Sequence, residues 1–326
     1  MTDNKPLKDP GHSEAQLAHV AMLYYREGLT QSEIAQRIGL SRATIVNYLR
    51  LARELGIVDI RIRGESFAAS PLARQLAEAF SLTDCYVAHH DLQPRSDDAV
   101  LDRVAQLAAS ALRDLLEPGD RLGVAWGETV QRVARRFPNG PIADLSVYQM
   151  VGSMSFNPLY AAEACAIEIA RRSLATCHTL HAPAVVSTAE LASKLCDEPV
   201  IARQLQDLST LSKAVFSVGS LSAPVTLMSS GMADDGELSI YLNKGAHGVF
   251  WGNFIDADGK EVTGPLSDRL IGVSLATLSA VKTRILVACG PDKREAVRSA
   301  LRGGFATHLI TDEDMATALL MPSRSA

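Results

Sequence analysis

Apolar residues recur with helical spacing in the first part of the chain. Leu17, Val20, Ala21 and Tyr24 stand at positions i, i+3, i+4 and i+7, which places them on one face of a helix. Gly28 follows as a helix-ending residue. This pattern predicts an amphipathic helix that begins near residue 13.

Two further short helices are predicted directly after the first. Thr30 is followed three residues later by Glu33, which is the capping-box pattern of a helix start, and Gly39 ends that helix. Ser41 can cap a third helix over Arg42–Leu55. Three helices therefore occupy about 45 residues, a size typical of small helical domains.

Val58–Arg63 alternates apolar and polar residues, which is the period of a β-strand. We expect this strand to form part of a wing beside the helices. The pattern divides the chain into a disordered lead-in at 1–12, a helical domain at 13–63 and a larger domain at 64–326.

Beyond Gly64, short apolar runs alternate with longer helical segments. This alternation predicts βαβ units, in which helices cover both faces of a parallel sheet. Strands are expected at Cys85–Ala88, Arg121–Ala125, Leu145–Met150, Thr176–Leu180, Ala214–Val218, Gly248–Phe250, Arg284–Ala288 and His308–Ile310. Helices are expected at Ala99–Leu116, Thr129–Arg136, Ala161–Arg172, Thr188–Leu195, Val200–Leu208, Leu275–Ser279, Lys293–Leu301 and Glu313–Leu320.

Composition excludes several classes of protein. Hydrophobic residues make up 47% of the 326-residue chain and charged residues 21%, which is ordinary for a globular protein and excludes a mainly disordered one. No apolar run reaches the roughly 18 residues that a membrane span needs. The five cysteines are widely spaced without a C-x-x-C pair, which favours a reducing compartment over a disulfide framework or a zinc site. We expect a cytoplasmic protein without a membrane segment.

The distribution of charge supports a DNA-binding role for the helical domain. The net charge is −5, but the segment from Arg37 to Arg63 has six basic and two acidic residues, a local charge of +4. The rest of the chain then carries −9. A basic domain joined to an acidic one is typical of a nucleic-acid-binding domain attached to a domain of another function.

The segment TQSEIAQRIGLSRATIVNYLRLAREL, from residue 30 to residue 55, fits a helix-turn-helix, whose second helix enters a major groove of DNA. Arginine suits guanine, asparagine suits adenine, and a threonine methyl can contact thymine. The alternative is a helical packing domain with a solvated basic face. Predicted DNA-binding residues are Gln31, Ser41, Arg42, Thr44, Asn47, Tyr48 and Arg50.

Several segments together resemble the SorC family of bacterial sugar-responsive transcriptional regulators, and the resemblance extends from about residue 13 over nearly the whole chain. It is carried by GESFAASPLARQLAEAFSL, LGVAWGETVQRVARRF, LHAPAVVSTAELASKL, GVFWGNFIDADGKEV, ILVACGPDKREAVRSALRGG and HLITDEDMATALL. It implies a large Rossmann-like α/β effector domain similar to sugar-phosphate isomerases and deaminases. It also implies a sugar effector, usually phosphorylated, and a homo-oligomer, typically a tetramer.

Candidate effector-binding residues follow several predicted strands. Gly127 and Thr129 match the family's phosphate-loop positions, and a helix N-terminus after a strand suits phosphate or sugar hydroxyls. Glu128 departs from the family pattern. The departure matters because a carboxylate repels a phosphate unless it points away. Lys293, at a strand-to-helix junction, is a suitable cation for phosphate. Hydroxyl groups are assigned to Asp256, by the resemblance, and to Gln149 and the Gly152–Ser153 loop.

Other site chemistries are less favoured. His89, His90 and Asp91, and the pair His178 and His181, could suggest metal binding, but no matching ligand set stands nearby in sequence. We therefore predict no metal and no cofactor.

The predicted function is a transcriptional regulator that binds operator DNA under the control of a sugar or sugar phosphate. The alternative is a phosphosugar isomerase or deaminase with an accessory helical domain. That enzyme would need an acid–base pair, for which Asp256 and Glu128 are the candidates.

Overall fold

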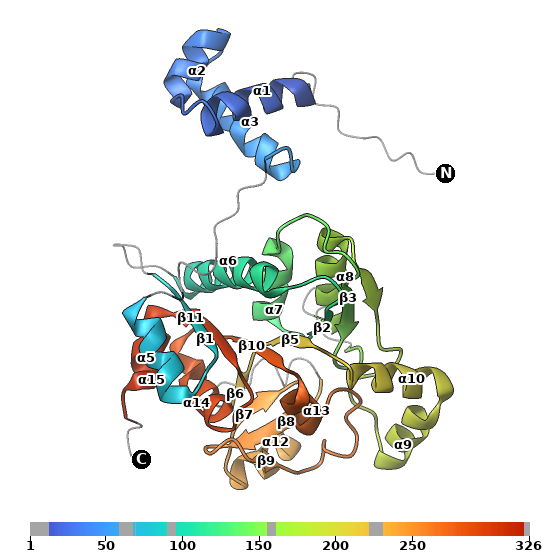
Figure 1. The fold of residues 1–326 in the computed structure, drawn as a ribbon. Coiled ribbons are helices and arrows are strands. Elements are labelled where there is room, and N and C mark those ends of the chain that lie inside the picture. Colours follow the sequence, from blue (N-terminus) through green and yellow to red (C-terminus); the bar gives the residue numbers. More distant parts are fainter. Residues whose placement is uncertain are drawn as a thin grey trace. The chain divides into compact units, whose positions relative to one another are not determined.

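The computed structural model describes residues 13–58, 68, 70–89, 96–154, 161–221 and 231–322. The chain divides into two compact units, one ending at Arg61 and the other beginning at Ile62 (Figure 1). The lead-in predicted at 1–12 lies outside the described residues, and so does nearly all of the strand predicted at Val58–Arg63. The wing therefore stays a prediction.

The first unit contains the three predicted helices, each begun by a capping side chain. Ser13 and Thr30 form capping boxes, and the hydroxyl of Ser41 accepts from the backbone N–H of Thr44. In each helix, one of the first-turn N–H groups that lack a partner within the helix thus donates to the capping side chain. The helices are α1 (Glu14–Tyr25), α2 (Gln31–Ile38) and α3 (Arg42–Glu54).

A single apolar core joins these helices. Leu23 of α1, Ile34 of α2 and Ile45 of α3 are fully buried in it. Burying each such side chain stabilises the fold by about 1.5–3 kcal/mol. Because all three helices contribute, the core holds α3 in a fixed position against α1 and α2.

The second unit is built on a seven-stranded sheet in the order β1-β11-β10-β5-β2-β3-β4. Every pair of neighbouring strands in it is parallel, as the alternation of strands and helices predicts. The strands are β1 (Asp84–Ala88), β2 (Arg121–Val124), β3 (Ser146–Gln149), β4 (Thr176–His178), β5 (Lys213–Phe216), β10 (Thr283–Val287) and β11 (His308–Asp312).

Helices cover both faces of this sheet (Figure 1). Successive strand residues enter different cores: Leu309 of β11 packs on one face and Ile310 on the other. One face carries α6 (Asp97–Leu115), α7 (Glu128–Arg136) and α8 (Ala162–Ser173); the other carries α5 (Pro71–Phe80), α13 (Leu275–Ala280), α14 (Arg294–Arg302) and α15 (Glu313–Leu320). The helices α9 (Ala189–Asp197) and α10 (Pro199–Leu208) follow β4, and the 3-10 turn η2 (Pro291–Lys293) precedes α14.

One strand expectation is wrong. Gly248–Phe250 does not join the parallel sheet but lies in a separate four-stranded antiparallel sheet, in the order β6-β7-β8-β9. Trp251 and Gly252, at φ of +39° and +104°, form the two-residue turn of a hairpin. The elements are β6 (Gly219–Ser220), β7 (Ala246–Phe250), β8 (Asn253–Asp256) and β9 (Glu261–Val262), with α12 (Asp235–Asn243) before β7.

The predicted fold class, a helix-turn-helix joined to a parallel α/β domain, is confirmed. Within the sheet, the chain builds β2, β3 and β4 in one direction and then returns to the other side of β2 with β5. The order of strands therefore reverses between β2 and β5. Ligands of open α/β sheets bind outside the carboxyl ends of the strands at such a reversal. No helix among the described residues is long and apolar enough to cross a membrane.

Candidate functional site

The start of α3 carries polar side chains on an exposed surface. Arg42 is exposed and lines a shallow hollow together with Gln31 and Thr30 from the start of α2. The hydroxyls of Ser41 and Thr44 are 2.8 Å apart, and that of Ser41 also accepts from the backbone of Thr44. The structure thus gathers the predicted residues of the two helix starts, with the hydroxyl of Ser41 capping α3 and that of Thr44 bonded to it.

One turn further along α3, Asn47 and Arg50 form a hydrogen-bonded pair. Arg50 Nη2 donates to the amide oxygen of Asn47 at 2.7 Å, and Arg50 Nη1 lies 2.6 Å from the carboxylate of Glu54. Val46, between Arg42 and Arg50 on the same face, is 46% exposed. The sequence analysis did not single out Val46, because apolar helix positions are normally assigned to the core.

Tyr48 must be removed from the predicted DNA-facing residues. Its side chain is 5% exposed and belongs to the core of the first unit, together with Ile45 and Leu49. The helical period explains this result, because Tyr48 stands three residues after Ile45 on the buried face of α3. The exposed face of α3 runs instead through Arg42, Val46, Asn47 and Arg50.

At the carboxyl edge of the seven-stranded sheet, the structure brings Thr129 and Lys293 together. Gly127 follows β2 at a φ of +116° and begins α7 without a side-chain cap. Thr129, in the first turn of α7, is 2% exposed, and Lys293 Nζ donates to its hydroxyl at 3.4 Å. The first N–H groups of α7, a buried hydroxyl and an ammonium group thus converge, which is a favourable arrangement for an anion.

Glu128, whose charge was the main objection to a phosphate here, is paired with an arginine of its own helix. Its carboxylate lies 2.5 Å from Arg132, one turn along α7. Arg132 also pairs with Asp98 and Asp102 of α6. The hydrogen bond from Arg132 and its charge lower the pKa of Asp98. Glu128 thus belongs to an ion-pair cluster in which Arg132 joins α7 to α6.

Gln149 is placed to support the structure of the site. It is 1% exposed, its Nε2 donates to the backbone oxygen of Val151 at 2.7 Å, and its Oε1 accepts from the N–H of Leu180 at 3.0 Å. Its amide joins the segment after β3 to the segment after β4. Direct binding of a sugar hydroxyl by Gln149 stays a prediction, but its closest partners belong to the protein.

Gly152 and Ser153 lie in the segment that Gln149 holds. A Cβ on Gly152 would stand 2.4 Å from the backbone of Pro183, so close packing requires glycine there. The backbone of Ser153 forms hydrogen bonds with Ala182 and Ala184, while its side chain is exposed. The hydroxyl of Ser153 is therefore presented at the surface of this segment.

Asp256 lies apart from Thr129 and Lys293. Its Oδ1 accepts from the backbone N–H groups of Asp258 and Lys260, closing the turn between β8 and β9. Gly259 in that turn packs against Gly303, at the end of α14, whereas Lys293 precedes the start of the same helix. One oxygen of the carboxylate that the family resemblance assigned to sugar hydroxyls thus closes a turn at the other end of α14, and effector binding by Asp256 stays a prediction.

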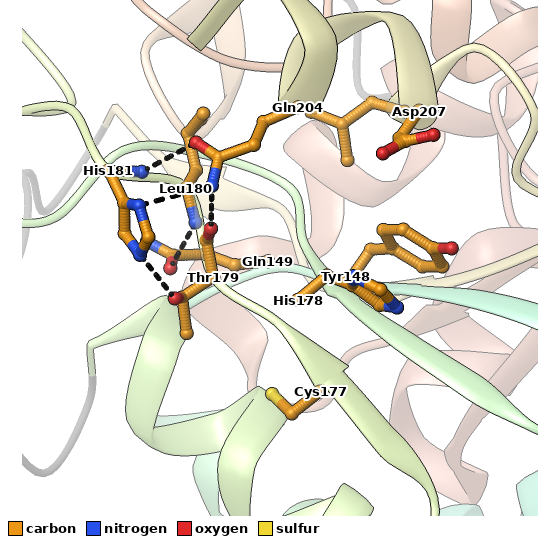
Figure 2. Close-up of a pocket in the computed structure, with 10 residues that line it drawn as sticks. Tyr148, Gln149, Cys177, His178, Thr179, Leu180, His181, Gln204 and Asp207 are labelled. Carbon is orange, nitrogen blue, oxygen red and sulfur yellow. Dashed lines mark hydrogen bonds between the residues drawn. The ribbon is translucent and has the colours of Figure 1, made fainter. Parts of the chain in front are cut away.

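A polar pocket of about 360 Å³ lies between β4 and α10 (Figure 2). Gln204 joins Thr179 and His181 there, donating to the Thr179 backbone oxygen at 2.9 Å and accepting from the His181 N–H at 3.0 Å. The ring of His178 stacks on Tyr148 at 4.4 Å. Among the described residues, no group of three or more histidine, cysteine or acidic side chains could hold a metal ion. The polar groups of this pocket mainly bind one another.

A larger cavity of about 870 Å³ lies at the carboxyl edge of the sheet, and the sequence analysis missed most of its walls. It is bounded by the starts of α6 and α7, by η2 and by the start of α15, and it is lined among others by Lys293, Cys289 and Asp312. Its size is that of a small-molecule site. Ser217, after β5 at the reversal of strand order, was also missed; its hydroxyl is buried without a hydrogen-bond partner in the described part of the chain.

No sequence motif marks Ser217 or the walls of this cavity. Their common signal is position, since each follows the carboxyl end of a buried strand or begins the next helix. That signal becomes useful only when the order of strands in the sheet is known, and the sequence does not reveal that order.

The chain is similar to known proteins over both of its units. A sugar-binding domain family matches residues 65–321, and a helix-turn-helix domain family matches residues 16–66. The chain is 35% identical over 305 residues to the transcriptional regulator YjhU of Escherichia coli K12, covering 93% of each chain. It is 31% identical over 314 residues to the transcriptional regulator LsrR of the same strain, covering 94% of this chain and 95% of LsrR.

Solved structures share the fold. The full-length sorbitol operon regulator SorC from Klebsiella pneumoniae superimposes with a TM-score of 0.74 at 24% identity, covering 95% of this chain and all of that one. A DeoR family transcriptional regulator from Listeria monocytogenes superimposes with a TM-score of 0.70 at 25% identity, covering 76% of this chain and 98% of that one.

Proposed function

This chain belongs to the SorC family of sugar-responsive transcriptional regulators, and from that membership we propose how its two units share the task. The protein is a DNA-binding regulator with a sugar effector. In our proposal, the exposed face of α3 reads the operator and the carboxyl edge of the seven-stranded sheet binds the effector. The relatives and structures compared above are transcriptional regulators, which disfavours the enzyme alternative.

The DNA-binding proposal assigns separate roles to the exposed residues of α3. Arg42 and Asn47 contact base edges, and Val46 offers an apolar contact for a thymine methyl. Arg50 neutralises a phosphate, a contact that positions the protein without reading sequence. The hydroxyls of Ser41 and Thr44, with Gln31 at the start of α2, are within the same surface and complete it.

The effector proposal is a sugar phosphate whose anionic group binds at the start of α7. The observation that carries it is the meeting of Thr129 and Lys293, 3.4 Å apart, beside the uncapped helix start at Gly127. Lysine with helix N–H groups is a common phosphate-binding combination. In this proposal Ser153 and Ser217, which follow the carboxyl ends of β3 and β5, contact hydroxyl groups of the sugar, while Gln149 and Gly152 hold the supporting segment in position.

We further propose that the protein acts as a homo-oligomer, with a tetramer as the expected state, in the cytoplasm where its DNA lies. One helix-turn-helix unit covers only a short half-site, whereas two-fold related units match a palindromic operator. Light scattering at micromolar concentration tests this proposal. A monomer both with and without DNA would contradict it.

The function is tested with the full-length protein and a labelled DNA duplex selected from a random pool. At about 150 mM salt, affinity for the selected duplex should exceed that for a scrambled duplex at least tenfold. A bound effector should change that affinity by about 5- to 150-fold, the usual range of allosteric coupling. Equal affinity for both duplexes would reject DNA recognition, and no response to any sugar or sugar phosphate would reject the sensor role.

A further inference from the structure

Asp312 is the last residue of strand β11 and lines the large cavity. Alternate residues of a strand point to the same face of the sheet. Ile310, two residues earlier on the same side, is fully buried in the core beneath α6. Asp312 continues that side beyond the core, where it lines the cavity of about 870 Å³. Its side chain is 5% exposed. A carboxylate is therefore buried at the wall of a cavity rather than displayed at the surface.

The two oxygens of Asp312 have different surroundings. Oδ1 caps α15, accepting from the backbone N–H groups of Asp314 and Met315 at 3.0 Å each. Oδ2 is buried and has no hydrogen-bond partner among the residues that the structure describes. A buried carboxylate oxygen without a donor is unfavourable and rare in native proteins. Capping explains why an aspartate stands at this position, but it leaves Oδ2 without a partner.

The surroundings indicate what could donate to this oxygen. Among the cations of the cavity wall, Arg132 is already shared by Asp98, Asp102 and Glu128, and Arg294 pairs with Glu295. Lys293 lines the same cavity with its ammonium group directed to Thr129. None of these three side chains donates to Asp312 Oδ2, so the missing donor is expected from a molecule in the cavity.

Cys289 lines the same cavity as Lys293 and Asp312. It is 7% exposed and forms part of the cavity wall. Burial, with a contribution from the charge of Asp312, raises the pKa of its thiol to about 12, and Lys293 acts in the opposite direction. The thiol therefore stays neutral at physiological pH. The wall of the cavity thus includes the cation Lys293, the buried carboxylate of Asp312 and the uncharged thiol of Cys289.

We propose that Asp312 accepts a hydrogen bond, through Oδ2, from a hydroxyl group of the bound sugar, and so determines which sugars the cavity accepts. This inference rests on the proposed function, in which Lys293 holds the anionic group of the same ligand. A phosphate would be repelled by Asp312, and an ammonium group by Lys293. A hydroxyl group donates without charge, so the ligand lies with its phosphate at Lys293 and its hydroxyl groups toward Asp312.

The test uses Asp312→Asn in the full-length protein. Asparagine caps a helix as well as aspartate does, so α15 keeps its cap while Oδ2 is replaced by a group that donates. Asp312→Ser keeps a capping oxygen and lacks the second oxygen altogether. Asp314→Asn is the matched control, since it removes the same charge from an exposed position on the wall of the same cavity.

Calorimetry measures the binding of glucose 6-phosphate, fructose 6-phosphate, sorbitol 6-phosphate, ribose 5-phosphate and inorganic phosphate. For a sugar phosphate that the unmodified protein binds, Asp312→Asn and Asp312→Ser should each weaken affinity at least tenfold. Inorganic phosphate should bind equally well or better, because it has no hydroxyl partner to lose and a negative charge has been removed. Asp314→Asn should change affinity less than threefold.

The outcomes separate this inference from the function on which it rests. If both Asp312 variants bind sugar phosphates as the unmodified protein does, water or the protein satisfies Oδ2 and the inference is overturned, while the proposed function stands. An equal loss for sugar phosphates and inorganic phosphate would also overturn it, because the effect would then not concern a hydroxyl group. If the unmodified protein binds none of the sugar phosphates, the proposed phosphosugar effector fails together with the inference.

Discussion

The ammonium nitrogen of Lys293 lies 3.4 Å from the hydroxyl of Thr129, although 164 positions separate the two residues in the chain. Thr129 lies in the first turn of the helix after β2, and Lys293 stands between β10 and α14. Only β5 separates β2 from β10 in the sheet. The sheet order thus produces a cationic, hydrogen-bonding corner at the place where open α/β sheets bind ligands.

Replacing Lys293 by alanine should weaken a phosphorylated effector strongly and an unphosphorylated sugar little. The variant removes the cation at this corner but leaves the N–H groups of α7 and the hydroxyl of Thr129. We expect at least a tenfold loss, about 1.4 kcal/mol, for a sugar phosphate. Calorimetry with the phosphorylated and unphosphorylated forms of the same sugar measures the difference.

The matched control is Lys282→Ala. Lys282 is exposed and precedes β10, at the opposite end of the strand that leads to Lys293. Lys282→Ala should leave the affinities for the phosphorylated and the unphosphorylated sugar unchanged. Equal phosphosugar affinity in Lys293→Ala and the unmodified protein would mean that the phosphate lies elsewhere, and a similar loss in both variants would indicate a nonspecific effect of net charge.

The fold was predictable as far as local pattern determines it. Capping residues such as Ser13, Thr30 and Ser41 marked the helix starts of the first unit, and apolar runs marked the buried parallel strands. The antiparallel sheet was missed because β6 and β9 have two residues each, too few to show a period. Its hairpin turn uses Trp251, a residue that no turn rule favours at positive φ.

The site was predictable only in part. Thr129 and Lys293 were both predicted, but from separate motifs, and the sequence could not show that they meet. Tyr48 was assigned to the DNA-facing surface because it follows Asn47, whereas the period of α3 buries it. In the sequence, Asp312 was only one residue of a segment that carries the family resemblance. Its unpaired oxygen could not be predicted, because it results from packing.

Gln149→Leu should lower stability, because the leucine would leave the N–H of Leu180 and the backbone oxygen of Val151 without their present partners. Each buried group left in this way costs about 1–3 kcal/mol. Chemical denaturation measures the loss. Gln204→Leu is the control: it removes similar hydrogen bonds to Thr179 and His181 in a less buried position, where water can replace them (Figure 2).

The two roles of Gln149 give different results. If Gln149 has a structural role, Gln149→Leu lowers stability, and sugar affinity falls only indirectly, because the supporting segment is held less firmly. Full stability with lost sugar affinity would instead identify Gln149 as a direct ligand of the effector, as the sequence analysis predicted.

The protein should lose stability as the pH falls from 7.5 to 5.5, in part through His308. Burial lowers the pKa of this imidazole below its ordinary value, with Lys213 and Arg284 acting in the same direction and Asp84 opposing them. Below about pH 6.5 the unfolded chain therefore binds a proton that the folded chain does not. The stability contribution is complete above the unfolded pKa and decreases as pH falls toward the folded pKa, by up to about 1.4 kcal/mol per pH unit.

His308→Gln isolates that contribution. Glutamine does not titrate and can keep a hydrogen bond to the neighbouring hydroxyl of Thr307, which lies 2.8 Å from the imidazole. Denaturation at both pH values should show a smaller loss of stability in the variant. An equal loss in both proteins would assign the pH dependence to other groups. Asp98 and Glu168 are not among them, because their lowered carboxyl pKa values place their effect at lower pH.

Arg42→Ala and Asn47→Ala should each weaken operator binding by about 1–3 kcal/mol and relax the preference at one base pair. Both side chains lie on the exposed face of α3. Fluorescence anisotropy with the selected duplex and with single-base variants of it measures both effects. Arg171→Ala, an exposed arginine on α8 of the second unit, is the charge-matched control and should change neither.

Arg50→Ala should behave differently, because its proposed partner is a phosphate. In the structure Arg50 donates to the amide oxygen of Asn47 and pairs with Glu54. Adenine would compete with Arg50 for the Asn47 amide oxygen, and a DNA phosphate offers Arg50 a new partner. Arg50→Ala should therefore weaken all duplexes about equally and reduce the slope of log K against log salt by about one. If it relaxed the base preference that Asn47→Ala also relaxes, with an unchanged salt slope, Arg50 would instead act by orienting Asn47.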